Sequence, residues 1–415
     1  MSSKNKNILL ISYVFPPYPG IGGRRWAKFA KYLAKKGYKV HVICAQNPFK
    51  ENSEWNRDVL GNENILIYEL PALYPTVLLK QPKNLFQKFV YRLSKNLLLL
   101  ISKGNIYERS LFWKNQLLKS AAKIIKENNV DNVIVSGAPF GLLYFATHLK
   151  KIYPQINLIS DIRDPWTWGK AYGFDTISKM RLNRELVKEA LVMERSNHIT
   201  VPVVPMSEYL NNKYPESCSK IKVLTHGIDM DDFPKWTNEN PLENTIYKII
   251  YGGTLYDDLL ESVTKLIESL NATKDSNYKI DFYTSVFKYQ KEFIKAGLTD
   301  KVQYHPLVST VDFSKKVMES DAVLILYPPQ YKDFLSTKFY EIVYLRKPII
   351  LISETGVLSN FIVQNNLGIH IEPKNIAGTF KKILKKKVNI PFNNNFEVSE
   401  YSYEKVTTKL EALFI

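Results

Sequence analysis

The chain has 415 residues, 45% of them hydrophobic and 23% charged, which is typical of a folded protein with two domains rather than one core. A formal net charge of +17 favours an anionic partner, such as nucleic acid, a phosphorylated small molecule or an anionic membrane surface. Nucleic acid is not expected, since the sequence has no zinc-finger spacing, no RNA-recognition aromatic motif and no helix-turn-helix signature.

The first residues of the chain lead into a predicted strand and lack the features of a targeting segment. Residues 1–7, MSSKNKN, contain no secretory apolar core, and no apolar run in the chain reaches the ~18 residues that span a bilayer. The two cysteines, Cys44 and Cys218, form neither a disulfide framework nor a metal-ligand cluster. We therefore expect a protein of the reducing cytoplasm without a bound metal.

The first elements predict a βαβ unit with a glycine-rich turn. Residues 6–12, KNILLIS, are apolar without alternation, as in a strand that is covered on both faces. Gly22 and Gly23 precede a predicted helix, and they allow the backbone to approach a ligand closely. Arg24 and Arg25 occupy the helix start, where an anion is favoured. The alternative is a plain flexible loop.

A basic, apolar segment lies after the first βαβ unit. Residues 71–107 contain no acidic residue. Basic residues punctuate its apolar ones: Lys80, Lys83, Lys88, Arg92, Lys95 and Lys103 among Leu85, Phe86, Phe89, Val90, Leu93 and 97–101. Two interpretations stay open. The stretch 80–103 can lie on an anionic membrane surface, or its leucines can pack on the N-terminal sheet beneath a solvated lysine rim.

The next strands end in a cluster of polar and aromatic residues. Residues 131–138 and 156–163 read as strands separated by helical periodicity, which predicts a doubly wound α/β sheet. Such sheets bind ligands outside the carboxyl ends of their strands, where the sequence has DIRDPWTWG. Asp164 can accept a proton there from a hydroxyl within hydrogen-bond reach. Asp161 and Arg163 can instead form a structural pair.

The sequence predicts two domains and a returning helix. Residues 231–245 are polar, turn-rich and without apolar periodicity, so we place the crossing between the domains there. The expected domains are residues 1–232 and residues 246–395, and residues 396–415 are expected to form a terminal helix that returns to the first domain.

The second domain repeats the pattern of strand and glycine turn. After the strand YKIIY, Gly252, Gly253 and Thr254 form a second close-approach turn before a helix, as a diphosphate requires. Asp257 and Asp258 follow. Two carboxylates would repel a diphosphate, so either they point away or a cation elsewhere neutralises the ligand.

That cation is predicted on a later helix. Ser336 can cap free N–H groups, Thr337 follows it, and Lys338 and Glu341 lie three residues apart on one face. Free amides and a lysine suit a diphosphate, and a carboxylate one turn on can accept hydrogen bonds from two ribose hydroxyls. The alternative is an ordinary ion pair on a surface helix.

In sequential order, these motifs resemble those of family-4-type retaining glycosyltransferases of the GT-B fold. Seven residues separate Asp333 from Glu341, matching the family's two-glutamate motif with aspartate at its first position. The "KP" after the helix, the glycine pair before the first helix and the D-x-R-D-x-W segment also fit. The resemblance implies two Rossmann-like domains facing a cleft. Leu307 and Tyr327 would line the nucleobase site.

The resemblance also implies an activity. A sugar would pass from a nucleotide diphosphate donor, most commonly UDP, to a glycan or lipid-linked acceptor in bacterial surface-polysaccharide synthesis, with retention and without a cofactor. Lys338 would stabilise the departing diphosphate and Glu341 would hold the ribose. Asp333 would contact the donor sugar, while Asp164, Arg24 and Arg25 would lie on the acceptor side.

Two further interpretations remain. The acids at positions 257, 258 and 333 are compatible with a non-catalytic sugar-nucleotide or polysaccharide-assembly binding protein. A nucleotide-sugar epimerase of the same fold is the second. In each case we expect the protein in the cytoplasm, in the transferase case with peripheral contact to the inner face of the plasma membrane.

Overall fold

The computed structural model describes residues 6–103, 105–169, 174, 176–233, 246–335, 337–385 and 388–415. The chain divides into two compact units. Unit 1 contains Met1–Thr225 and Tyr403–Ile415, and unit 2 contains His226–Ser402. Most of the expected crossing, from residue 234 to residue 245, lies outside the described residues.

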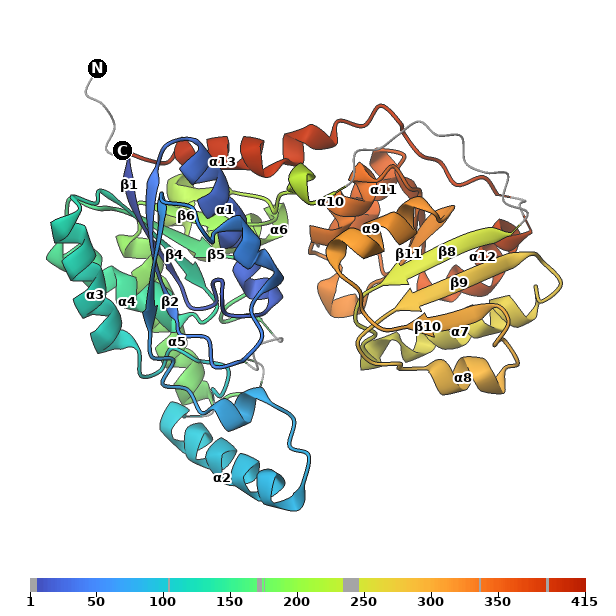
Figure 1. Ribbon diagram of the computed structural model, residues 1–415, viewed down its shortest axis with the longest axis horizontal. Helices are drawn as coiled ribbons and strands as arrows, with labels where there is room; N and C mark the ends of the chain where they lie inside the picture. The colour runs from blue at the N-terminus through green and yellow to red at the C-terminus, as the bar shows by residue number, and fades with distance from the viewer. Residues whose placement is uncertain are drawn as a thin grey trace. The chain divides into compact units, whose positions relative to one another are not determined.

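Unit 1 is built on a parallel sheet with the strand order β3-β2-β1-β4-β5-β6-β7 (Figure 1). Its strands are β1 (Asn7–Ser12), β2 (Lys39–Ala45), β3 (Ile65–Leu70), β4 (Asn132–Gly137), β5 (Asn157–Ile162), β6 (His198–Val201) and β7 (Ile221–Val223). Its helices are α1 (Arg24–Lys35), α2 (Leu85–Ser102), α3 (Lys114–Glu127), α4 (Gly141–Ile152), α5 (Lys179–Arg195), α6 (Val204–Lys213) and α13 (Tyr403–Glu411).

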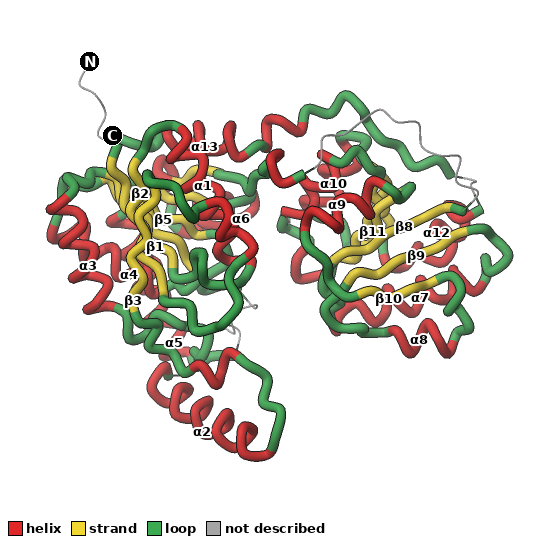
Figure 2. The backbone as a smooth tube through the Cα atoms, viewed as in Figure 1, coloured by secondary structure: helices red, strands yellow, loops and turns green. Residues whose placement is uncertain are grey.

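Unit 2 contains a second parallel sheet with the order β10-β9-β8-β11-β12-β13 (Figure 2). Its strands are β8 (Tyr247–Gly252), β9 (Tyr278–Tyr283), β10 (Val302–His305), β11 (Ala322–Leu326), β12 (Ile349–Ile352) and β13 (Gly368–Ile371). Its helices are α7 (Leu260–Asn271), α8 (Gln290–Lys295), α9 (Thr310–Met318), α10 (Thr337–Tyr344), α11 (Val357–Gln364) and α12 (Ile376–Leu384).

Both sheets follow from continuous apolar strands. In β1, all residues after Asn7 are buried, and β1 pairs in parallel with β2 and β4. Each buried leucine or isoleucine contributes about 1.5–3 kcal/mol. The strand order reverses between β1 and β4 in unit 1 and between β8 and β11 in unit 2. The expected class, α/β with two Rossmann-like domains, is confirmed.

Helix α13 belongs to unit 1. Tyr403, Val406 and Leu410 are buried in the same cluster as Phe29 of α1, and the Tyr403 and Phe29 rings meet edge to face with centroids 5.4 Å apart. The Lys36 ammonium lies 2.8 Å from a carboxylate oxygen of Glu411. Within the described residues, no helix is long and apolar enough to cross a membrane.

A buried carboxylate, Glu108, caps helix α4. Its Oε2 accepts a hydrogen bond of 3.0 Å from the Gly141 N–H, and its Oε1 accepts from the Ser110 N–H at 3.3 Å and from the Ser110 hydroxyl. A Cβ at Gly141 would lie 2.6 Å from the Ser110 Oγ, so only glycine fits at this helix start. Burial raises the pKa of Glu108 above its ordinary value of 4.5.

This raised pKa predicts a pH effect on stability. Because the folded protein binds the Glu108 proton more tightly than the unfolded chain, the free energy of unfolding should rise as the pH falls from above the raised pKa toward 4.5. The slope from this group is at most about 1.4 kcal/mol per pH unit. In Glu108→Gln, which keeps an acceptor for Gly141, this slope should disappear from urea-unfolding curves measured across pH. Identical pH profiles for the two proteins would contradict the assignment.

Candidate functional site

The carboxyl end of β8 in unit 2 forms a tight turn of two glycines, Gly252 and Gly253. A Cβ at Gly252 would lie 2.2 Å from the Cζ of Phe313, and Gly253 has a φ of +153°, which L side chains rarely adopt. The Gly253 N–H donates to the Tyr283 carbonyl at 3.0 Å. The turn lies where the strand order reverses, next to β11, which is where open α/β sheets bind ligands.

Helix α10 places a cation on this turn. Phe339, Ile342 and Val343 are buried in the core of unit 2 and fix the orientation of the helix. The solvent-exposed Lys338 then reaches the glycines: its Nζ donates to the Gly252 carbonyl at 3.1 Å. The same Nζ lies 3.0 Å from the position that a Cβ of Gly253 would take. The structure therefore places Lys338 beside the second glycine turn.

Glu341 lies one turn along α10 from Lys338. The side chain is half-buried, and its Oε1 is shielded from solvent. Ser336 lies outside the described residues, and α10 is described from Thr337 onward. Thr254, also predicted to be in this site, accepts the Tyr251 hydroxyl at its carbonyl, 2.8 Å away. This hydrogen bond from a residue of β8 holds the backbone of the turn at Thr254.

The two acids after the glycine turn have their own partners. Asp257 forms an ion pair with Lys288, and Asp258 accepts a hydrogen bond of 2.7 Å from the Gln330 amide. Both partners were missed by sequence reasoning, because they come from loops distant in the chain and carry no local signal. With Asp257 neutralised and Asp258 directed at Gln330, the electrostatic objection to a diphosphate at Gly252 and Gly253 is reduced.

Three further predicted residues lie at or beyond the strand ends of unit 2. Asp333 is exposed in the segment before α10. Leu307, after β10, is 56% exposed, so it is not a core residue. Tyr327, after β11, is half-buried, donates its hydroxyl to the Phe334 carbonyl at 3.3 Å, and has its pKa raised by burial.

In unit 1, the arginines after the first glycine turn are buried. Arg24 and Arg25 are each 3% exposed. The Arg24 guanidinium lies over the Trp55 ring, 4.5 Å from its centroid. Arg25 bonds Asp161 through its Nε, at 3.3 Å, and through its Nη2, at 3.2 Å. Arg25 was expected to bind the anionic group of a ligand, but its guanidinium binds the Asp161 carboxylate of the same unit.

Arg163 does not form the structural pair with Asp161 that the sequence left open as an alternative. Arg163 contacts Asp164, with its Nε 3.5 Å from the carboxylate, rather than Asp161. It also donates to the carbonyls of Gly22 and of Ala138, the latter at 3.0 Å. A Cβ at Gly22 would lie 3.1 Å from the Arg163 Nη2, so the absence of a side chain at Gly22 leaves room for the Arg163 guanidinium. Asp164 is 35% exposed beside this arginine, which leaves its carboxylate accessible.

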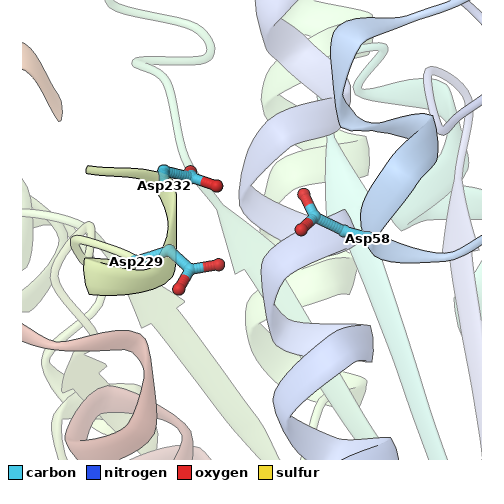
Figure 3. Close-up of side chains that lie close together, drawn as sticks. All are labelled: Asp58, Asp229 and Asp232. Carbon is cyan, nitrogen blue, oxygen red and sulfur yellow. The ribbon is translucent and has the colours of Figure 1, made fainter. Parts of the chain in front are cut away.

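Figure 3 shows Asp58, Asp229 and Asp232, and the first two have structural roles within their own units. Asp58 ends the short helix Glu54–Asp58 of unit 1, where the Nζ atoms of Lys28 and Lys31 lie 2.8 and 3.7 Å from its carboxylate. Asp229 caps the turn Met230–Asp232 of unit 2 by accepting the Asp231 N–H at 3.2 Å. Asp58 is neutralised by lysines, so we assign no metal to it.

No protein-family model and no curated protein matches the sequence. Solved structures do match over nearly the whole chain. A glycosyltransferase from Rickettsia africae is 17% identical, with 99% of this chain and 94% of that chain covered and a TM-score of 0.58. The apo form of the lipopolysaccharide outer core galactosyltransferase WaaB is 11% identical, with 98% of each chain covered and a TM-score of 0.61.

An epimerase also matches. The UDP-GlcNAc 2-epimerase from Methanocaldococcus jannaschii is 12% identical, with 98% of this chain and 99% of that chain covered and a TM-score of 0.53. Identities this low show the fold alone. The chain has a GT-B-like fold, which glycosyltransferases and nucleotide-sugar epimerases share.

Proposed function

We propose that this chain is a retaining, family-4-type glycosyltransferase that moves a sugar from a nucleotide diphosphate donor to a glycan or lipid-linked glycan in the cytoplasm. The observation that carries the proposal is the position of Lys338. Its ammonium lies on a tight turn of two glycines, 3.1 Å from the Gly252 carbonyl, at the point of unit 2 where the strand order reverses. A cation and a closely approachable backbone at that point suit a diphosphate.

In this proposal the reaction breaks the bond between the sugar's anomeric carbon and the diphosphate oxygen, and the acceptor hydroxyl forms the new bond. Lys338 neutralises charge on the departing diphosphate. Glu341 accepts hydrogen bonds from the ribose, and Asp333 contacts the hydroxyls of the donor sugar. Asp164 accepts the proton of the acceptor hydroxyl. Leu307 and Tyr327 line the nucleobase. We favour UDP because two matching structures are named for UDP-N-acetylglucosamine 2-epimerases.

A nucleotide-sugar epimerase is the second candidate, favoured by those same matches. It would use the same donor site in unit 2. The two candidates differ in the need for an acceptor: an epimerase changes the sugar's configuration with nucleotide sugar alone, whereas a transferase forms product only when an acceptor is present.

The first test is a thermal-shift series with UDP, GDP and ADP. We expect UDP to raise the melting temperature of the wild-type protein and to have no effect on Lys338→Ala/Glu341→Ala, because ligand binding to the folded state stabilises it. The matched control is Lys316→Ala/Glu319→Ala. It removes an exposed pair at the same three-residue spacing at the end of α9, with Nζ and Oε2 3.0 Å apart.

The control should keep the full shift. No shift with any nucleotide, or an equal loss in both double variants, would overturn the donor site. If UDP binds, proton NMR of UDP-sugar incubated without acceptor separates the candidates, because it reads the configuration of the sugar, which epimerisation changes without changing the mass. An epimerised sugar without acceptor would replace the transferase by the epimerase.

A further inference from the structure

Helix α2 has well-defined ends at the periphery of unit 1. At its start the Asn84 side chain accepts the Gln87 N–H at 2.8 Å, and at its end Lys103 adopts a left-handed conformation with φ +54°. Figure 1 shows the helix projecting from unit 1, away from the sheet. The chain therefore forms a stable helix of 18 residues where it covers little of the core.

The side of α2 that faces away from unit 1 is apolar. At about 100° per residue, the shielded positions Tyr91, Ser94 and Leu98 share one side of the helix. The opposite side carries large apolar side chains that are 56 to 77% exposed, namely Phe86, Phe89, Leu93, Leu97 and Leu100, which we call the outer face. Single exposed apolar residues are common on protein surfaces, but a contiguous apolar face of this kind indicates a binding surface.

The charges around the outer face have one sign. No acidic residue lies between Glu69 and Glu108. Lys88 and Arg92 are exposed along one border of the outer face, and Lys80, Lys83 and Lys103 are at its ends. A basic border beside exposed phenylalanine and leucine matches a surface that is negatively charged outside and apolar beneath.

We propose that α2 docks on an anionic lipid surface, with its axis parallel to the membrane plane and its outer face in the headgroup layer. Lys88, Arg92 and Lys95 interrupt the apolar sequence within the helix, which suits a helix lying in the interface. Long basic side chains can extend to lipid phosphates while their stems cover apolar surface. This inference rests on the exposed face and the charge, and it does not depend on the proposed function.

The segment that carries α2 is tied to the first loop of unit 1. The Trp113 indole N–H donates to the Pro71 carbonyl at 2.8 Å, which closes the segment at its base. The Tyr13 hydroxyl donates to the Ala72 carbonyl at 3.0 Å, and Arg109 forms a side-chain hydrogen bond with Tyr18. A docked α2 would thus hold the loop after β1, the predicted acceptor-side loop, at a fixed position relative to the membrane.

The test uses the full chain and flotation with vesicles of phosphatidylglycerol and phosphatidylcholine, compared with vesicles of phosphatidylcholine alone. We expect binding to the anionic vesicles, weakened by salt. The variant Phe86→Ser/Phe89→Ser/Leu93→Ser should lower the partition coefficient more than about 100-fold. The variant Lys83→Gln/Lys88→Gln/Arg92→Gln should lower it about 100-fold on anionic vesicles only.

Each variant has a matched control in unit 1. Leu60→Ser/Ile152→Ser/Val187→Ser removes apolar side chains that are similarly exposed, and Lys119→Gln/Lys123→Gln/Lys126→Gln removes exposed lysines of α3. Both controls should bind as the wild type does, and circular dichroism should show all four variants folded.

Three results would overturn the proposal. These are no binding of the wild type to anionic vesicles, equal losses in variants and controls, or light scattering that shows an oligomer which the serine variant of α2 converts to a monomer. The last result would assign the outer face to a second copy of the chain.

Discussion

Replacing Lys338 with methionine is expected to lower turnover by about 100- to 1,000-fold, because the variant loses the cation that faces the departing diphosphate in the proposed reaction. Methionine keeps much of the length of the lysine stem, so α10 should remain packed through its buried face. The Lys338 Nζ donates to the Gly252 carbonyl at 3.1 Å, within reach of a ligand on the turn of Gly252 and Gly253. The measurement is kcat at saturating UDP-sugar and acceptor, with circular dichroism to show that the variant folds.

The split between kcat and KM decides what Lys338 does. A group that acts mainly on the transition state lowers kcat, whereas a group that binds substrate and transition state equally raises KM alone. Lys316→Met on α9 is the matched control, since that lysine is exposed on a helix of the same unit. A change confined to KM in Lys338→Met would contradict the role in turnover and leave Lys338 as a binding residue.

The fold could be predicted from the sequence because its signals are local. The run KNILLIS has no alternation, and it forms the fully covered strand β1. The strand expected at residues 247–251 is β8, and the glycine turn expected after it is present at Gly252 and Gly253. Alternating strands and helices determine a doubly wound sheet, so that class followed from periodicity. The GT-B-like arrangement followed from the resemblance of the motifs to a known family.

The site was less predictable, because pairing across the chain leaves no local pattern. Arg25 and Asp161 are 136 positions apart, and nothing near either residue indicates that they bond. Gln330 and Asp258 are 72 positions apart. Sequence reasoning therefore placed an unpaired cation at the first glycine turn and unpaired acids at the second. For α2, the sequence left open whether its apolar residues contact a membrane surface or pack on the sheet, and the exposed leucines of the outer face now exclude full packing on the sheet.

Asp161 is the centre of the polar core of unit 1. Its Oδ2 accepts from the Trp26 indole at 3.0 Å and from the Ser136 hydroxyl at 3.1 Å, and its Oδ1 accepts from the Thr200 hydroxyl at 2.8 Å. Arg25 completes the set. The donors come from α1, β4 and β6, so one fully buried carboxylate joins three elements around the end of β5.

Asp161→Ala is expected to lower the free energy of unfolding of unit 1 by about 3–5 kcal/mol, because it leaves the Arg25 guanidinium buried without its counter-ion. Urea unfolding followed by tryptophan fluorescence measures this, since five of the six tryptophans belong to unit 1, namely Trp26, Trp55, Trp113, Trp166 and Trp168. Asp164→Ala, three residues on and 35% exposed, is the matched control and should cost less than about 1 kcal/mol.

A double variant of Asp161 and Arg25 shows whether the loss of stability comes from the broken ion pair or from a packing defect. If the loss in Asp161→Ala comes from the stranded charge, the double variant Asp161→Ala/Arg25→Met should recover part of it, because the uncompensated guanidinium is gone. Arg25 also donates to the Leu224 and Thr225 carbonyls, so recovery should be incomplete. Additive losses in the double variant would mean that Asp161 and Arg25 stabilise unit 1 independently. In that case the hydrogen bonds to those two carbonyls would stabilise the buried Arg25, and the neutral donors around Asp161 would stabilise its carboxylate.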